Sequence, residues 1–130
     1  MRIFEFKAVA EFRKREAVSD EGLAVAIETA RRGLIDSNIG GGLIKQRVVK
    51  PYRRSGSRML IGLRPDRAIV LFGFLKHERD NIDDKQRTTL QEIIASWFAA
   101  DDDQIARALD DGVLVEVEHR QENKNQSPAD

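Results

Sequence analysis

The chain contains no cysteine, and this absence excludes several chemistries at once. Disulfides, thiolate–zinc sites and a cysteine nucleophile are ruled out, and a chain without thiols fits the reducing cytosol. Long hydrophobic runs are also absent, since no apolar stretch approaches the roughly 18 residues of a membrane span. The N-terminus carries Glu5 and no long apolar segment, so we expect no secretory signal. We therefore expect a cytoplasmic protein that does not associate with membranes.

Histidine is scarce, and its positions in the sequence offer no metal-binding spacing. His77 and His119 lie far apart, whereas the ligands of a zinc site usually come in closely spaced pairs. The other candidate ligands are the carboxylates of residues 101–103 and 110–111. Consecutive side chains point away from one another on a helix, so we interpret these as helix caps and surface charge. We predict neither a metal ion nor another cofactor.

Charge is unevenly distributed along a chain whose formal net charge is zero. Residues 45–79 contain 10 Lys/Arg and 2 Asp/Glu, a net charge of +8, whereas residues 80–130 contain 5 and 13, a net charge of −8. Residues 1–44 balance at 7 of each. Many positive charges in a short segment repel one another unless a partner neutralises them, which indicates RNA or another polyanion. Alternatively, the acidic C-terminal segment neutralises part of this charge.

The first third of the chain has the pattern of a short strand followed by two helices. Residues 2–6 favour a strand and residues 7–16 a helix. Ser19 predicts the N-cap of a second helix, which we expect to end at Gly33. The apolar stripe of this second helix consists of Leu23, Ala26, Ile27 and Ala30. The two helices are expected to form a hairpin.

The middle of the chain predicts antiparallel strands. The glycine run at 40–42 interrupts the chain, and strands are expected at residues 43–49, 58–64 and 67–75. Residues 50–57 are interpreted as a loop, and Pro65 with Asp66 as the turn of a hairpin. The strand at 67–75 is almost wholly apolar, which is typical of an interior position in a sheet.

The last third predicts two helices and an edge strand. The apolar spacing of a core-facing helix is present in Leu90, Ile93, Ile94, Trp97 and Phe98. Residues 101–103 cap a second short helix, and residues 113–118 alternate as an edge strand. The order of elements indicates an α+β fold, in which an N-terminal helical hairpin packs on an antiparallel sheet followed by C-terminal helices. We expect one domain over residues 1–118 and a polar, disordered tail over residues 119–130.

Strand geometry places basic side chains of separate strands on one face. Because side chains two apart share a face, Lys45 and Arg47 point the same way, away from their apolar neighbours. Arg58 lies on the face of Gly62, where the missing side chain is expected to leave room for a ligand. Adjacent strands lie about 5 Å apart, so we expect these cations to converge on a shallow site of phosphate size. A solvated basic face that serves only solubility is the alternative. Further cations follow the interior strand directly, at Lys76, His77 and Arg79.

Aromatic residues near this basic region are candidates for stacking on a nucleobase. Tyr52 is the best of them, because it lies in a basic loop. Trp97 belongs to an apolar helical stripe, and we assign it to the core. Phe72 and Phe74 share a face of the interior strand, and the core is the default interpretation for both, with stacking open to one of them. The basic residues of the loop that we also expect to contact RNA are Lys50, Arg53 and Arg54.

Three stretches of the chain resemble a known family, at residues 33–48, residues 55–58 (Ser-Gly-Ser-Arg) and residues 72–84. They resemble the RelE/ParE superfamily of toxins from type II toxin–antitoxin systems, and most closely its prophage-associated RelE branch. The resemblance covers about residues 1–118 and is specific in residues 33–84. It implies a helical hairpin packed on a curved antiparallel sheet, in agreement with the pattern of predicted elements.

The resemblance also implies an activity. RelE-like toxins are mRNA interferases that act in the ribosomal A site without a metal ion: the ribose 2′-OH attacks the adjacent phosphate and leaves a 2′,3′-cyclic phosphate and a 5′-OH end. The paired basic residues of the family's first sheet strand correspond to Lys45 and Arg47. The arginine of its Ser-Gly-aromatic-Arg stretch corresponds to Arg58. The basic stretch after the interior strand corresponds to Lys76, His77 and Arg79.

Chemical roles follow from these correspondences. Lys45 or His77 is the candidate general base. Arg58, with Arg47 beside it, is expected to stabilise the phosphorane, because a guanidinium matches phosphate oxygens in a bidentate manner. Lys76 and Arg79 are the candidates for positioning RNA or for acting as the general acid.

The chain departs from the family pattern at several positions. Ser57 stands where relatives carry an aromatic residue, residues 81–83 lack a tyrosine that some relatives have, and His77 stands where relatives often carry arginine. Either the site is rebuilt around His77, whose imidazole titrates near neutral pH, or activity is lowered. The alternative function is a non-nuclease interaction protein, namely a ParE-like gyrase inhibitor or an inactive prophage remnant. In either case the resemblance implies a cognate antitoxin, expected to be a helix-turn-helix protein from an adjacent gene.

Overall fold

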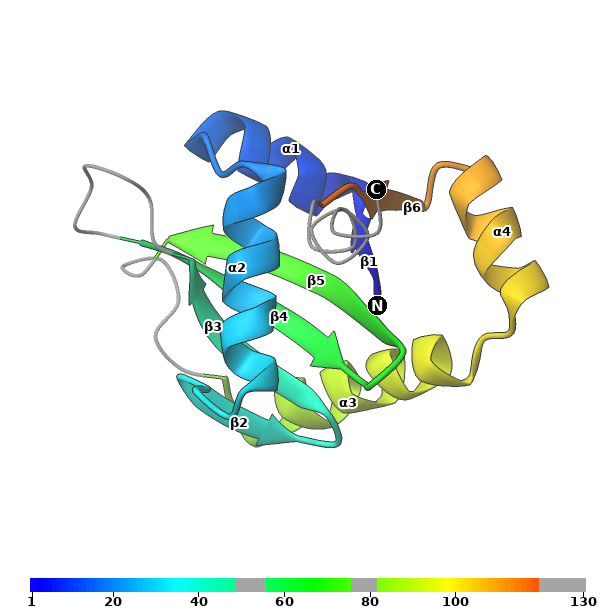
Figure 1. Ribbon diagram of the computed structural model, residues 1–130. Helices are drawn as coiled ribbons and strands as arrows, with labels where there is room; N and C mark the ends of the chain where they lie inside the picture. The colour runs from blue at the N-terminus through cyan, green and yellow to red at the C-terminus, as the bar shows by residue number, and fades with distance from the viewer. Residues whose placement is uncertain (49–55, 76–81, 120–130) are drawn as a thin grey trace.

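A computed structural model describes residues 1–48, 56–75 and 82–119 of the chain (Figure 1). In chain order its elements are β1 (Arg2–Phe6), α1 (Lys7–Glu16), α2 (Asp20–Arg31), β2 (Ser37–Gly40), β3 (Leu43–Val48), β4 (Ser57–Leu63), β5 (Arg67–Leu75), α3 (Asp84–Ala99), α4 (Asp102–Asp110) and β6 (Leu114–Val117). The helices and strands expected from the sequence are confirmed within these ranges. One further strand, β2, was not predicted from the sequence. It is short and pairs with β3 just before the glycine turn.

The strands form one mixed sheet in the order β2-β3-β4-β5-β1-β6, and this corrects the expectation of an antiparallel sheet. The β3–β4 and β4–β5 pairs are antiparallel, as expected for strands joined by short connections. In contrast β1 runs parallel to β5, with Glu5 opposite Val70, and antiparallel to β6. A parallel pair needs a long crossover, and here the chain between β1 and β5 provides it.

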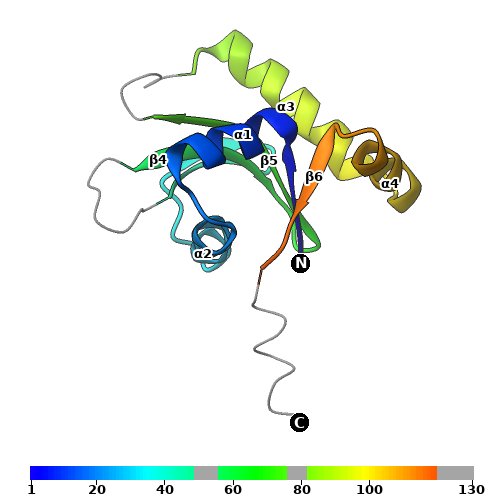
Figure 2. The same ribbon diagram turned by 90° about the horizontal axis from the view of Figure 1, so that it is seen from above.

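Helices cover both faces of the sheet, with α2 on one side and α3 on the other (Figure 2). On the α2 side, the largest buried side chains include Leu23, Ile27, Met59 and Ile61. On the α3 side, they include Leu43, Leu60, Ile69, Ile94 and Ile105. Each such side chain, when fully buried, contributes about 1.5–3 kcal/mol. The sheet is therefore held by a separate core on each face.

The helix ends follow the capping chemistry expected from the sequence. The Ser19 hydroxyl accepts a hydrogen bond from the backbone N–H of Gly22 at 2.9 Å, and Gly33 follows the end of α2 with a φ of +94°. Asp101 caps α4 and forms a capping box with Gln104. This bears out the interpretation of that carboxylate as a helix cap. Among the described helices, none is long and apolar enough to cross a membrane.

Fewer residues of α3 are buried than the apolar spacing of the helix predicts. Leu90 and Ile94 are buried, while Trp97 and Phe98 are half-buried against the same core. The Trp97 ring meets the Phe6 ring edge to face at a centroid distance of 5.7 Å, which agrees with its assignment to the core. Ile93 does not belong to this core, because it lies at the border of the stripe and 38% of it is exposed.

A buried ion cluster joins the first strand to the two N-terminal helices. Arg13 of α1 donates two hydrogen bonds to the Glu5 carboxylate of β1, at 2.8 and 2.7 Å, and Glu5 is only 1% exposed. The same guanidinium donates to the Asp20 carboxylate at 2.8 Å and to the backbone carbonyl of Val18 at 3.0 Å. Hydrogen bonding to Glu5 raises the pKa of Arg13 above its ordinary value. The cluster fixes β1 against the start of α2, and the sequence pattern did not predict it.

Candidate functional site

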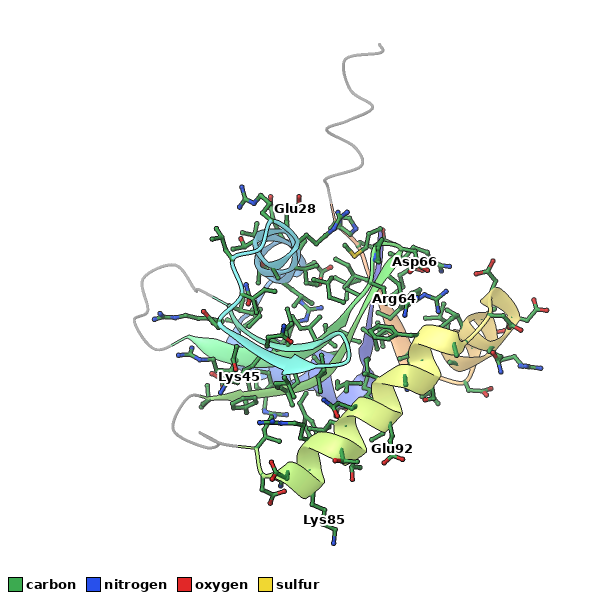
Figure 3. The ribbon with its side chains drawn as sticks, turned by 90° about the horizontal axis from the view of Figure 1, so that it is seen from below. Glu28, Lys45, Arg64, Asp66, Lys85 and Glu92 are labelled. Atoms are coloured by element: carbon green, nitrogen blue, oxygen red, sulfur yellow. The ribbon has the colours of Figure 1, made fainter. Side chains whose placement is uncertain are left out.

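Three of the predicted site residues lie on one face of the β3–β4 pair. Lys45 and Arg47 point away from Ile44 and Val48, which are buried on the opposite face. In the antiparallel register Arg47 lies directly opposite Arg58, and Lys45 lies opposite Leu60. Because directly opposite residues share a face, Lys45, Arg47 and Arg58 form one surface, which we call the cationic face. In Figure 3 Lys45 lies on the sheet to one side of α3.

The two arginines of the cationic face form a like-charge pair. Directly opposite residues in an antiparallel pair have Cβ atoms about 4.5–5.5 Å apart, and like charges at such positions destabilise a sheet. The Nη1 atom of Arg58 is buried and has no hydrogen-bond partner among the described residues. A buried donor left unpaired costs about 1–3 kcal/mol, and more when it is charged. An anion beside Arg58 would give this buried donor a partner.

Gly56 is a site residue that the sequence analysis did not single out. A Cβ atom at this position would lie 2.9 Å from the carbonyl oxygen of Val48 and 3.3 Å from Cγ of Arg47. Glycine therefore lets the backbone before β4 lie close to the Val48 carbonyl, with the Arg47 side chain packed beside it. The signal in the sequence was the glycine of the Ser-Gly-Ser-Arg stretch, whose meaning depends on a neighbour in another strand.

The expected role of Gly62 is wrong. A Cβ atom on Gly62 would overlap the side chain of Ile94 and lie 3.1 Å from Cζ of Phe98. The room that glycine leaves is therefore filled by α3 and not open to a ligand. Gly62 instead allows α3 to lie close to the sheet beside the cationic face.

A buried glutamine anchors the strand that carries Arg47. Gln46 is 3% exposed on the α2 side, where its amide donates to the carbonyl oxygens of Ala26 and Leu34 at 3.3 and 3.0 Å. Its side-chain oxygen accepts from the backbone N–H of Asp36 at 3.1 Å. The Asp36 carboxylate in turn accepts from the backbone N–H of Arg47 at 2.6 Å. These bonds hold β3 against the segment that leads into β2, which fixes the backbone beneath the arginine pair.

The two phenylalanines of β5 differ in environment although they share a face. Phe74 lies opposite Arg58 and is 7% exposed, so its default assignment to the core is confirmed. Phe72 lies opposite Leu60 and is 45% exposed, so the same assignment is wrong for it. Phe72 therefore lies on the same side of the sheet as the cationic face, with the buried Leu60 and Phe74 between them.

Seven of the predicted site residues lie outside the described residues. They are Lys50, Tyr52, Arg53, Arg54, Lys76, His77 and Arg79. Convergence with the cationic face is therefore still a prediction for these seven. Within residues 1–48, 56–75 and 82–119 there is no group of three or more histidine or acidic side chains placed to hold a metal ion.

Taken together, these features define a small α+β protein with helices on both faces of a mixed sheet and a like-charge arginine pair on one of its strand pairs. The family model described as the RelE toxin of the RelE/RelB toxin–antitoxin system matches residues 1–117, and the chain belongs to this family. Membership implies that the chain is the toxin component of such a system and that it has an antitoxin partner. No curated protein sequence matches the chain.

Proposed function

We propose that the chain is a metal-independent mRNA interferase of the prophage-associated RelE branch, and that it binds an RNA phosphate between Arg47 and Arg58. The observation that carries this proposal is the direct opposition of the two arginines across β3 and β4. A phosphodiester at this position gives the buried Nη1 of Arg58 a partner and lies beside a second cation, Arg47. Specificity for RNA over other anions comes from the chemistry, which uses the ribose 2′-OH as the nucleophile.

The proposed reaction needs one base, one acid and a cationic clamp. Lys45 or His77 accepts the proton of the 2′-OH, whose oxygen forms a bond to the adjacent phosphorus. Arg58 and Arg47 stabilise the charge that gathers on the equatorial oxygens of the phosphorane. The bond from phosphorus to the 5′ oxygen then breaks, and Lys76, Arg79 or the protonated base donates a proton to that oxygen. The products are a 2′,3′-cyclic phosphate and a 5′-OH end.

Ribosome dependence is part of the proposal. The three side chains of the cationic face, Lys45, Arg47 and Arg58, lie within one strand pair and therefore form a small surface. Phosphate contacts position a nucleic acid but carry no sequence information. Selective cutting of mRNA therefore needs a second surface, which we propose is the ribosomal A site. Inhibition of translation follows from the loss of mRNA.

The reaction is tested by incubating the purified chain with a defined mRNA, with and without ribosomes. We expect cuts that leave 5′-OH and 2′,3′-cyclic phosphate ends and that disappear when the cut nucleotide is 2′-deoxy. Cuts that leave 5′-phosphate ends, or cleavage of the deoxy substrate, contradict the mechanism. Intact RNA combined with inhibited DNA gyrase in a supercoiling assay replaces the proposal with the ParE-like alternative. Intact RNA with normal supercoiling assigns the chain as an inactive, antitoxin-binding remnant.

A further inference from the structure

The backbone of Arg47 is held by a carboxylate at the outer edge of β3. The neighbouring strand β2 begins at Ser37, which lies opposite Lys45, so β3 continues past the start of β2. Beyond that point the backbone N–H of Arg47 donates a hydrogen bond to the Asp36 carboxylate at 2.6 Å. A side chain thus supplies the acceptor that a neighbouring strand supplies elsewhere in a sheet.

This hydrogen bond is short and ionic. Backbone N–H groups usually lie about 2.9–3.0 Å from their acceptors. A charged acceptor makes such a bond shorter and roughly twice as strong. Backbone at the edge of a sheet opens more readily than backbone in its interior, because water competes for its hydrogen bonds. The Asp36 carboxylate therefore restrains β3 at the residue whose side chain faces Arg58 on the cationic face.

Asp36 is itself held by the residue that precedes Arg47. The side-chain oxygen of Gln46 accepts from the backbone N–H of Asp36 at 3.1 Å, so each segment bonds the backbone of the other with a side chain. Gln46 is 3% exposed, and its amide nitrogen donates to the carbonyl oxygens of Ala26 and Leu34. Buried polar groups whose hydrogen bonds are all made rigidify their surroundings. The hydrogen bonds therefore link α2 to Arg47 through a buried side chain.

The charge of Asp36 opposes the binding of an anion. Asp36 is exposed and bonds the backbone of Arg47, so its carboxylate lies close to the cationic face. A negative charge there lowers the positive potential that attracts a phosphate. The hydrogen bond and the charge of this carboxylate thus act in opposite directions on the site. An asparagine separates the two effects, because it keeps an acceptor oxygen and carries no charge.

We propose that Asp36 is a positioning residue for RNA cleavage, which acts through its hydrogen bond to the backbone of Arg47 and is supported by Gln46. The bond fixes the point of β3 from which the Arg47 side chain reaches the phosphate beside Arg58. Asp36 itself contacts neither RNA nor the reacting atoms. The effect on cleavage rests on the proposed function, whereas the effect on the Arg47 backbone rests only on the hydrogen bonds of Asp36.

Two variants of Asp36 separate the hydrogen bond from the charge. Asp36→Ala removes both, and kcat for cleavage of a defined mRNA should fall at least about tenfold, since a small displacement of a positioning group has a large effect on rate. Asp36→Asn keeps the acceptor, so its kcat should stay within about threefold of that of the unaltered chain. Its KM should fall about twofold, the scale of one screened surface charge. A merely structural role does not produce this split.

The matched control is another exposed aspartate that accepts a backbone hydrogen bond. The Asp101 carboxylate accepts from the N–H of Gln104 at 2.8 Å and caps α4, which packs beside β6 and far from β3 in the strand order. Asp101→Ala removes the same kind of bond, so it should lower Tm as Asp36→Ala does and leave kcat within about twofold. Circular dichroism and thermal unfolding show that each variant is folded.

Hydrogen exchange of the Arg47 amide, followed by NMR, tests the positioning without RNA. Asp36→Ala should raise its exchange rate at least about tenfold and Asp36→Asn less than about threefold, because only the former loses the acceptor. Gln46→Met should also raise this rate, since it removes the bond that holds the Asp36 backbone. Asp101→Ala should leave it unchanged.

Several results overturn this inference. Full kcat in folded Asp36→Ala removes Asp36 from the reaction. Equal losses of kcat in Asp36→Ala and Asp36→Asn assign the effect to the charge and not to the hydrogen bond. Unchanged exchange of the Arg47 amide in Asp36→Ala shows that the bond does not restrain β3. If the unaltered chain leaves RNA intact, the nuclease proposal fails and the role of Asp36 in cleavage fails with it, while the exchange rates still decide whether Asp36 holds Arg47.

Discussion

Arg47 of β3 and Arg58 of β4 face each other directly across two antiparallel strands, and both belong to the predicted catalytic set. A like-charge pair at directly opposite positions lowers stability unless something lies between the charges. Strand register alone brings them together, so the site needs no loop to form its centre.

Removing one arginine is expected to abolish most of the RNA cleavage. Arg58→Ala should lower the cleavage rate at least about a hundredfold, which is the scale of losing one donor that stabilises transition-state charge. Single-turnover cleavage of a defined mRNA measures the rate. Arg64→Ala is the matched control, because Arg64 is an exposed arginine at the far end of β4, over the Phe98 ring. Full activity of Arg58→Ala removes this residue from the mechanism.

The same pair is expected to make the fold sensitive to oxyanions. Sulfate or inorganic phosphate should raise the Tm of the unaltered chain more than chloride does at equal ionic strength. In Arg58→Gln this difference should shrink, because one half of the clamp is missing. Thermal unfolding monitored by circular dichroism measures the shifts, with Arg64→Gln as the control. Equal sulfate effects in all three proteins would show that the arginine pair binds no anion.

Substitution of Gly56 is expected to act through Arg47. Gly56→Ala places a methyl group 2.9 Å from the carbonyl oxygen of Val48 and 3.3 Å from Cγ of Arg47, so the backbone beside Arg47 must shift and its side chain with it. We expect cleavage to fall about tenfold or more, since small displacements of positioning groups have large effects on rate. A double-mutant cycle with Arg47→Ala checks the cause. Additive losses in the double variant would mean that Gly56 acts independently of Arg47.

The close approach of α3 to the sheet is expected to depend on Gly62. Gly62→Ala should lower the free energy of unfolding by about 1–3 kcal/mol, because the new methyl group overlaps the Ile94 side chain. Urea unfolding measures this loss. In the double variant Gly62→Ala/Ile94→Ala, the shorter side chain at position 94 makes room for the new methyl group. The loss in free energy of unfolding should therefore be smaller than the sum of the losses in the two single variants. A strictly additive result contradicts the proposed clash.

The ion pair between β1 and β6 is expected to give a pH-dependent part of the stability. Arg2 donates hydrogen bonds to Glu116 at 2.9 and 2.8 Å, and these lower the pKa of Glu116 below its ordinary value. A lowered folded-state pKa stabilises the fold above the unfolded pKa of about 4.3 and loses this effect as the pH falls through the folded-state pKa. Because both side chains are partly exposed, the effect should stay below about 1 kcal/mol.

Glu116→Gln is the variant that measures this contribution. Urea unfolding of both proteins should show the variant less stable at pH 7, and the difference should shrink as the pH falls below the unfolded pKa of about 4.3. A stability difference that stays constant from pH 7 to pH 3 would show that the Glu116 charge plays no part in it.

Local patterns in the sequence were sufficient for most elements of the fold. The N-cap at Ser19, the turn at Pro65 and the period-two pattern around Lys45 depend on neighbours in the chain, and each occurs as predicted. The shared face of Lys45 and Arg47 followed from the same period. Their alignment with Arg58 required only the antiparallel pairing of neighbouring strands.

Features that depend on distant residues were not predictable in this way. No local signal shows that β1 joins β5 in parallel, because that choice is made across the intervening chain. Whether the space at Gly62 holds a ligand or a helix depends on where α3 lies. The exposure of Ile93 follows from the crossing of α3 over the sheet, and the periodicity of the helix does not contain that information.

The position of β1 in the sheet determines when this strand can find its partners during synthesis. Phe4 is 1% exposed, yet its strand neighbours, β5 and β6, are made long after it during synthesis. The first strand therefore has no partner until β5 (Arg67–Leu75) has been translated, and its other edge stays open until β6 follows. A chain that ends before Leu114 leaves an open edge on β1, so interrupted translation releases fragments prone to aggregation and proteolysis in place of an assembled toxin.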